Sequence, residues 1–148
     1  MNINITLRDP IASDANVFYE HQADPVACRV AHFDARTEKE FTQHWQTITS
    51  RDDVKISTID SDGSVVGNLV SWQQDGQRLV GFWLGQNYWG KGVASRALEL
   101  FTQSLPRPLF AYVHTSNIAS QRVLEKCGFM LCTHVACDNE QEFLFRLD

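Results

Sequence analysis

Residues 79–105 constrain the fold most strongly, because an apolar run, a short polar turn, a glycine-rich segment and an amphipathic helical pattern follow one another there without a break. The glycine-rich segment is Gly90-Lys91-Gly92-Val93-Ala94. Glycine has no Cβ and lets the backbone approach a ligand closely, while the free N–H groups and the dipole at a helix start favour phosphate oxygens. The stretch therefore predicts a strand, a phosphate-binding turn and a helix.

The segments before this stretch predict an antiparallel meander. Alternating apolar and polar positions predict strands over residues 3–8, 54–60, 65–73 and 78–84. The joints between the last three strands contain Asp62-Gly63 and Asp75-Gly76, and the Asp-Gly pair is typical of tight hairpin turns. Helices are predicted from Ser13 or Asp14 to His21, with Asp24-Pro25 as the break, and over residues 37–49.

The segments after it predict a parallel crossover and a closing hairpin. Helical spacing over residues 93–105 is followed by a short apolar strand, 109–113, and a strand-helix-strand passage of this length closes as a parallel, right-handed unit. A further helix is expected over 117–127, and strands over 129–136 and 142–147 around Asp138-Asn139. The expected fold class is α/β of the α+β type, with one mixed sheet of six or seven strands and about four helices, in a single domain of residues 1–148.

Composition excludes several classes of protein. The formal net charge of -5 provides no basic surface for a nucleic acid. No run reaches the roughly 18 apolar residues of a membrane span, and the first residues lack the pattern of a signal peptide. A cytoplasmic location with neither a membrane nor a nucleic acid as partner is therefore expected.

The cysteines favour neither disulfides nor a metal site. The chain has four of them, Cys28, Cys127, Cys132 and Cys137, and no C-x-x-C pair, so reduced and mostly buried thiols are expected. Cys132 and Cys137, together with His134, could be drawn as metal ligands, but their alternation is typical of a strand. No metal is expected.

Two common phosphate motifs fit the glycine segment poorly. Gly85 and Gly90-Lys91 have the spacing of a Walker A loop, but Gly92 occupies the position where that motif has the Ser or Thr that holds magnesium. A dinucleotide fingerprint belongs in the first strand-to-helix turn, whereas Gly90 and Gly92 lie past the middle of the chain, behind the meander.

Two motifs together resemble the GNAT superfamily of acyl-CoA-dependent N-acetyltransferases. Residues 87–94 (NYWGKGVA) are similar to its pyrophosphate loop, and residues 117–129 (NIASQRVLEKCGF) to its second signature. Both lie on the expected elements and in the expected order, and they look most like the branch of ribosomal-protein amino-terminal acetyltransferases. The resemblance implies a single-domain GNAT fold and direct transfer of an acetyl group from acetyl-CoA to an amine of a small molecule or a peptide amino terminus. Homodimers are frequent in this superfamily.

The resemblance also implies how the cofactor is held. Strand 79–84 is expected to bulge near Gly81 and to splay from strand 109–113, which opens a slot for the pantetheine arm. Asn117 is expected to contact this arm or an ordered water; a simple helix cap is the alternative, and both roles can hold at once. The residues whose backbone would hold the arm and the pyrophosphate are Phe82, Trp83, Leu84, Trp89, Gly90, Lys91, Gly92, Val93 and Ala94. The Lys91 side chain is the candidate to add positive charge, with a solvated lysine as its alternative.

The catalytic groups are less clearly marked. Many members carry a Tyr that protonates the leaving thiolate, and here that position is Leu124. Ser120 is the candidate to assist the thiolate, or else a small residue that packs under the sheet. His114 is the best placed candidate base, because histidine is the side chain suited to proton transfer near neutral pH, and an ordinary surface histidine is its alternative.

Three further residues and one other class of protein complete the expectations. His21 and Asp24 could face the acceptor or be solvated loop residues, and Cys127 is expected to pack on the apolar face of its helix. Because no Tyr acid and no obvious base is present, a non-catalytic acyl-CoA-binding or sensor protein of the same fold is the alternative to an enzyme.

Overall fold

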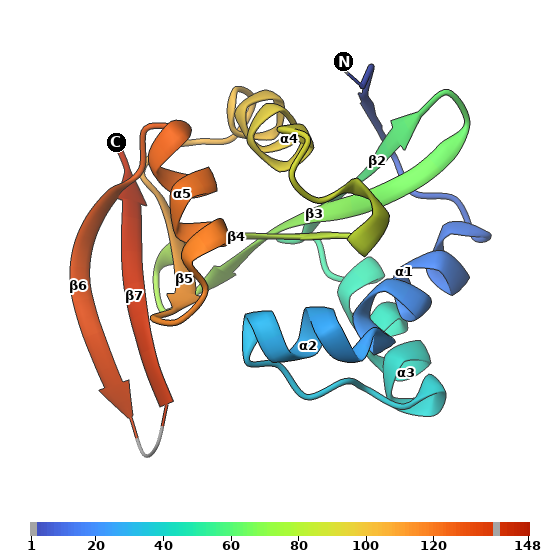
Figure 1. Cartoon of the computed structure of the whole chain (residues 1–148), viewed down its shortest axis with the longest axis horizontal. Helices are drawn as coiled ribbons and strands as arrows, with labels where there is room; N and C mark the ends of the chain where they lie inside the picture. The colour runs from blue at the N-terminus through green and yellow to red at the C-terminus, as the bar shows by residue number, and fades with distance from the viewer. Residues whose placement is uncertain (1–2, 138–139) are drawn as a thin grey trace.

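The computed structural model describes residues 3–137 and 140–148. Figure 1 shows one sheet with α1, α2 and α3 on one side and α4 and α5 on the other. The sheet has seven strands in the order β1-β2-β3-β4-β5-β7-β6. The strands are β1 (Thr6–Arg8), β2 (Lys55–Ser61), β3 (Ser64–Gln74), β4 (Gln77–Leu84), β5 (Leu109–His114), β6 (Met130–Cys137) and β7 (Glu140–Leu147). The helices are α1 (Asp14–Ala23), α2 (Pro25–Ala31), α3 (Glu38–Thr49), a short 3-10 helix η1 (Gln86–Tyr88), α4 (Val93–Thr102) and α5 (Ile118–Lys126).

The expected meander and crossover are confirmed. Strands β2, β3 and β4 pair antiparallel, and β4 pairs parallel with β5. The two Asp-Gly joints have positive φ at both residues, 51° and 88° at Asp62-Gly63 and 51° and 77° at Asp75-Gly76, as tight two-residue hairpins require. The α+β fold class is therefore confirmed, while the turn expected at Asp138-Asn139 lies outside the described residues. The single-domain boundary, 1–148, stays a prediction.

Two sequence predictions at the amino-terminal side are wrong in detail. Strand β1 is limited to Thr6–Arg8, because β2 ends in its hairpin just beyond the pairing of Thr6 with Asp60 and offers no partner to residues 3–5. Asp24-Pro25 ends α1 but also begins α2: the Asp24 carboxylate accepts the N–H of Val26 at 2.9 Å, and proline is tolerated in a first helical turn. The described residues thus contain five α-helices rather than four.

The core lies between the sheet and α4. Val93, Ala97 and Phe101 recur on one face of α4 and are 2%, 0% and 1% exposed, whereas Leu100 is 42% exposed. The buried face packs on a layer of apolar side chains from the sheet and α5, which includes Ile59, Val66, Leu69, Val80, Leu109, Ala111 and Leu124. This packing holds the start of α4 firmly against the end of β4.

The thiols only partly match expectation. Cys28 and Cys127 are half-buried and Cys132 is exposed on the edge strand β6, so the expectation of mostly buried thiols is wrong for Cys132. All three are free, and the Cys137 side chain lies outside the described part. Among the described residues, no three His, Cys, Asp or Glu side chains converge as metal ligands. No described helix is long and apolar enough to cross a membrane.

A buried carboxylate joins β1, α1 and β2. The Asp14 side chain is 2% exposed and accepts two hydrogen bonds from the Arg8 guanidinium, at 2.9 and 3.1 Å. It also accepts the Thr58 hydroxyl at 2.8 Å and the Ile11 N–H at 2.9 Å. Burial by itself would raise the pKa of Asp14, but these donors together outweigh it and hold the pKa below the ordinary value.

Asp14→Asn is expected to lower the free energy of unfolding by about 3 kcal/mol, because the buried amide no longer neutralises the Arg8 guanidinium, which keeps only its contact with Asp60, and the amide NH₂ group then meets the donors that surround Asp14. The lowered pKa means that the wild-type contribution is present above the unfolded pKa of about 3.9 and is lost as pH falls through the folded value. Urea unfolding at pH 7 and at acid pH measures both effects. The control is Asp148→Asn, which breaks the Arg146–Asp148 pair, where the Asp148 side chain is 80% exposed, and should leave stability unchanged. An equal loss in both variants would contradict the prediction.

Candidate active site

A cavity of about 550 Å³ lies where β4 and β5 separate. The two strands pair only at Arg78–Leu109 and Leu79–Phe110, and beyond these pairs they diverge. The expected splay is therefore present. The expected bulge at Gly81 is wrong, because the β3–β4 register runs without a shift from Gln74–Gln77 to Gly67–Leu84.

Contacts on the two sides of the cavity explain why the strands diverge. The end of β4 is tied toward β3 and α1: the Gly85 N–H donates to the Val66 carbonyl at 2.9 Å, and Trp83 Nε1 donates to the His21 carbonyl at 3.0 Å. Strand β5 instead pairs with β7 along its whole length, from Leu109 to His114. Each strand thus keeps its backbone hydrogen bonds on one side and leaves the side that faces the cavity open.

The glycine turn borders the cavity at the start of α4. Gly90 and Gly92 have φ values of 73° and 75°, and a Cβ built on either would meet no atom within 4 Å. Among the described residues no side chain caps α4, so its first N–H groups face the turn. Trp89 closes the turn by donating Nε1–H to the Leu84 carbonyl at 3.2 Å. This is an open cradle of backbone donors, as a phosphate ligand requires.

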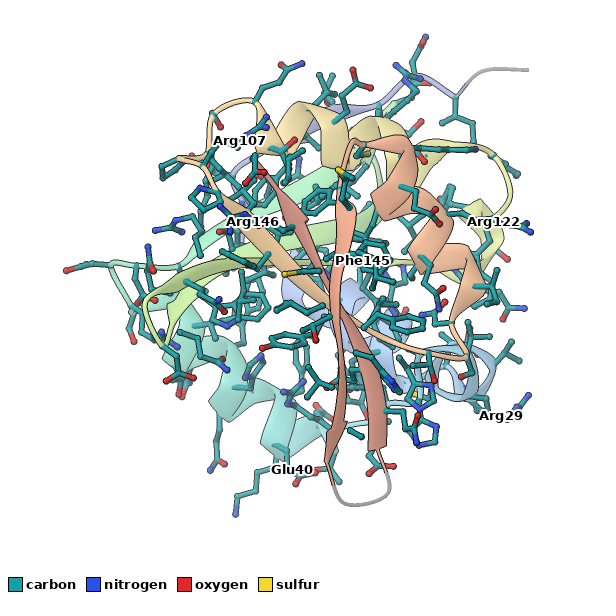
Figure 2. All side chains as sticks on the ribbon, turned by 90° about the vertical axis from the view of Figure 1, so that its left-hand side faces the viewer. Arg29, Glu40, Arg107, Arg122, Phe145 and Arg146 are labelled. Carbon is teal, nitrogen blue, oxygen red and sulfur yellow. The ribbon has the colours of Figure 1, made fainter. Side chains whose placement is uncertain are left out.

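The cations beside this cradle differ from the one that the sequence suggested. Lys91 is exposed and does not line the cavity in the described structure, whereas Arg122 and Lys126 on α5 do. In Figure 2, Arg122 extends from α5 on the side where the loop before α4 lies. Sequence reasoning overlooked both residues, although their spacing from Ala119 places all three on one face of the helix.

Asn117 and Ser120 come together at the start of α5. Asn117 is 7% exposed, and its Oδ1 accepts the N–H of Ser120 at 3.2 Å, so the helix-cap interpretation is confirmed. Its own N–H donates to the His114 carbonyl at 2.9 Å, which joins β5 to α5. Asn117 and Ser120 both line the cavity, together with Phe82, Trp83, Leu84, Trp89, Gly90, Gly92, Val93 and Ala94 from β4 and the turn.

His114 lines the cavity at the end of β5, with one ring nitrogen engaged by Ser116. Its Nδ1 accepts the N–H of Ser116 at 3.1 Å and lies 2.7 Å from the Ser116 hydroxyl. A backbone N–H can only donate, so in the neutral ring the proton is on Nε2 and this nitrogen is a donor. The arrangement therefore disfavours His114 as a base, since its free lone pair is already engaged by Ser116.

Glu142, which sequence reasoning missed, supplies a carboxylate at the same place. It pairs directly with His114 between β7 and β5, so the two side chains are on the same face of the sheet, and both line the cavity. Only strand register brings them together, and no local motif marks Glu142.

His21 and Asp24 do not face the cavity. His21 lies in the last turn of α1, where its Nε2 is 2.7 Å from the position that a Cβ on Gly85 would take, and burial lowers its pKa. Asp24 caps α2. Neither residue lines the cavity in the described structure, and contact with an acceptor stays a prediction. The alternative of solvated loop residues is wrong, because His21 belongs to α1 and Asp24 caps α2.

Leu124 and Cys127 have apolar surroundings. Leu124 is 1% exposed and lines the cavity at the position where many GNAT proteins have the Tyr acid. Cys127 donates its thiol to the Ser95 carbonyl at 3.2 Å, and burial raises its pKa, so it stays a protonated thiol that joins α5 to α4. The expected packing role of Cys127 is consistent with this contact.

The fold and the cavity define a domain with an open site between two splayed parallel strands, bordered by a turn of backbone donors suited to phosphate. Residues 4–130 match the sequence model of the acetyltransferase (GNAT) domain, and the chain belongs to this family. The expectation of a GNAT acetyltransferase, drawn from the two motifs, is thereby confirmed at the level of the family.

The chain is also similar to two Bacillus proteins. It is 29% identical over 106 residues to the probable N-acetyltransferase YjcK of Bacillus subtilis (strain 168), a match that covers 68% of this chain and 55% of that protein. It is 25% identical over 142 residues to the uncharacterized N-acetyltransferase p20 of Bacillus licheniformis, a match that covers 84% of this chain and 78% of that protein. The chain thus spans about half the length of the first of these relatives.

Solved structures confirm the fold. A GNAT-family acetyltransferase from Bacillus anthracis superposes with a TM-score of 0.81 at 19% identity, over 99% of this chain and 98% of that one. Spermidine N-acetyltransferase from Vibrio cholerae, in complex with CoA and spermine, superposes with a TM-score of 0.82 at 12% identity, over 97% of this chain and 94% of that one. The RimL ribosomal L7/L12 alpha-N-protein acetyltransferase, in complex with CoA, superposes with a TM-score of 0.80 at 18% identity, over 97% of this chain and 93% of that one. At these identities the likeness shows the fold alone.

Proposed function

We propose that this chain transfers an acetyl group from acetyl-CoA directly to an amine of a small molecule or a peptide amino terminus. The observation that carries the proposal is the cavity between β4 and β5, which reaches from the glycine turn before α4 to the underside of α2. Such a passage lets a phosphate-bearing thioester and an amine approach one another from opposite faces of the sheet. Family membership supports the same chemistry.

The chain's own residues fit acetyl-CoA. The backbone N–H groups from Trp89 to Ala94 would bind the pyrophosphate, and Arg122 and Lys126 would add charge from α5. The backbone of Phe82, Trp83 and Leu84, which faces the cavity without a partner strand, would pair with the amides of the pantetheine arm. Lys91 is a weaker candidate, because it is exposed and outside the cavity lining.

Proton transfer is assigned to side chains that line the cavity around the end of β5, contributed by β5, β7 and α5. The neutral amine attacks the thioester carbonyl, a tetrahedral oxyanion forms, and the carbon–sulfur bond breaks to release the CoA thiolate. Glu142 would take the proton that the amine loses, and the Nε2–H of His114 would donate a hydrogen bond to a substrate oxygen. The hydroxyl of Ser120, whose backbone N–H is bound by Asn117, would donate a hydrogen bond to the thiolate, since the Leu124 side chain has no proton to donate.

The acceptor is proposed to be cationic in water. Glu142 lines the cavity beside His114, where the proposal puts the reaction, and a carboxylate favours an ammonium group. Polyamines and peptide amino termini both fit, and the names of two structural neighbours describe acetylation of a polyamine and of a ribosomal-protein amino terminus. Membership of the ribosomal-protein branch and a homodimeric assembly stay proposals, to be checked with peptide acceptors and by light scattering.

The experiment that tests the function is a scan of thiol release from acetyl-CoA over polyamines, peptides with free amino termini and aminoglycosides. Turnover on any amine, with acetylated product found by mass spectrometry, supports the proposal. Tight CoA binding with no turnover on any member would instead favour a non-catalytic acyl-CoA sensor. That alternative is motivated by Leu124 in place of a Tyr acid.

Removal of metals is expected to leave turnover unchanged. The proposed transfer needs only a base, hydrogen-bond donors and a bound thioester, and no cluster of three candidate ligands exists among the described residues. Assays after dialysis against EDTA, and again after addition of Zn²⁺ or Mg²⁺, measure this. A loss of turnover that a metal restores would contradict the prediction.

A further inference from the structure

His32 and His114 form a stacked pair at the end of the cavity that lies under α2. Their ring centroids are 4.1 Å apart and their planes differ by 17°. His32 is the C-cap of α2, and His114 is the last residue of β5. The stack therefore joins α2, whose Ala27, Val30 and Ala31 line the cavity, to the strand that carries the proposed hydrogen-bond donor.

The backbone of His32 is adapted to this contact. Its φ and ψ are 53° and 50°, in the left-handed region that few residues other than Gly, Asn, Asp and His adopt. The conformation ends α2: the N–H of Phe33 bonds back to the Cys28 carbonyl at 2.9 Å and turns the chain away from the helix axis. Asn at this position would keep the turn but would lose the ring.

The contacts of His114 show what the stack contributes. The Ser116 N–H and hydroxyl both contact Nδ1, at 3.1 and 2.7 Å, and define which nitrogen carries the proton, but contacts at a single ring atom leave the ring free to tilt about it. The face-to-face contact with His32 restricts that tilt. The two contacts together fix the direction in which Nε2–H points.

We propose that His32 is a positioning residue for acetyl transfer: its ring, stacked on His114, holds the Nε2–H of His114 in the orientation that the reaction needs. This inference rests on the proposed function. His32 does not line the cavity in the described structure, so it acts through His114 and not on the substrate. Its stacking surface, rather than its nitrogens, is what the role requires.

The test compares His32→Asn, which keeps a residue suited to the left-handed turn but removes the stack, with His32→Phe, which restores an aromatic face without nitrogens. Arg29→Ala, at an exposed position of α2 (Figure 2), is the control for general effects on the helix. His32→Asn should lower kcat about tenfold, less than the roughly 10²-fold that a misplacement of 1 Å can cost. The KM for acetyl-CoA should not change, and His32→Phe should recover most of the loss.

Nitrogen NMR of the imidazole rings measures which nitrogen of His114 carries the proton, and it needs no acceptor. The His114 signals are assigned by comparison with His114→Gln. In the wild-type protein and His32→Phe the Ser116 N–H should keep His114 in the single Nε2–H form, whereas in His32→Asn the ring should tilt away from this donor and show a mixture of the two forms. The proposal would be overturned if His32→Asn had the kcat of the wild-type protein and the single Nε2–H form of His114. It would also be overturned if His32→Phe had a kcat as low as that of His32→Asn. No turnover by the wild-type protein would refute the proposed function and the part of His32 in it, and the NMR comparison would show whether the stack itself orders His114.

Discussion

Glu142→Gln is expected to lower kcat about 10³-fold, within the 10²–10⁴-fold range that a positioned proton-transfer group contributes. Glutamine has nearly the same shape as glutamate but cannot accept a proton. Glu142 is held by pairing with His114 on one side and Val135 on the other, so the strand should be unaffected. The affinity for CoA should also be unchanged, because Glu142 belongs to β7 and not to the glycine turn or α5, which would hold the pyrophosphate.

Steady-state kinetics with the best amine, and calorimetry with CoA, measure the two quantities separately. Glu125→Gln is the matched control, because Glu125 is exposed on α5 and does not line the cavity in the described structure. It removes the same charge and should leave kcat unchanged. A Glu142→Gln protein with the kcat of the wild-type protein would show that Glu142 is not the base.

Gly92→Asp is expected to abolish measurable CoA binding. A carboxylate at the N-cap of α4 would face the pyrophosphate, and two like charges about 4 Å apart repel by about 4 kcal/mol at an effective dielectric constant of 20. Since 1.4 kcal/mol is a factor of ten, one phosphate charge alone would raise Kd nearly a thousandfold. The protein should still fold, because a Cβ at Gly92 meets no atom within 4 Å.

Two controls separate charge from backbone strain. Gly92→Asn has the same shape and a similar tolerance of positive φ without the charge, so it should weaken CoA binding far less. Gly76→Asp places a carboxylate at a comparable φ of 77° in the β3–β4 hairpin, also in open space, and should leave CoA affinity unchanged. Calorimetry with CoA and thermal unfolding measure affinity and folding. A folded Gly92→Asp protein with wild-type affinity would remove the glycine turn from the cofactor site.

Local patterns explain which elements were predictable. The Asp-Gly pairs specify their turns through residues that tolerate positive φ, and Thr37 with Glu40 specifies the start of α3 through a capping box. Helix α2 was missed because Asp24-Pro25 serves equally well as the end of one helix and the start of the next. Propensity alone does not choose between these two roles, whereas packing of Ala27 into the core does.

The sequence by itself determined the family, because the two motifs, residues 87–94 and 117–129, are continuous stretches of the chain. The same stretches predict the kind of ligand that we propose. Only the tertiary structure decided which side chains meet at the reacting end. Glu142 lies opposite His114 because of strand register, and His32 stacks on His114 because α2 ends in a left-handed turn. Arg122 lines the cavity and Lys91 does not, because α5 presents Arg122 toward the cavity. Each of these contacts joins residues that are distant in the chain, so it depends on how the elements pack and not on any pattern within one of them.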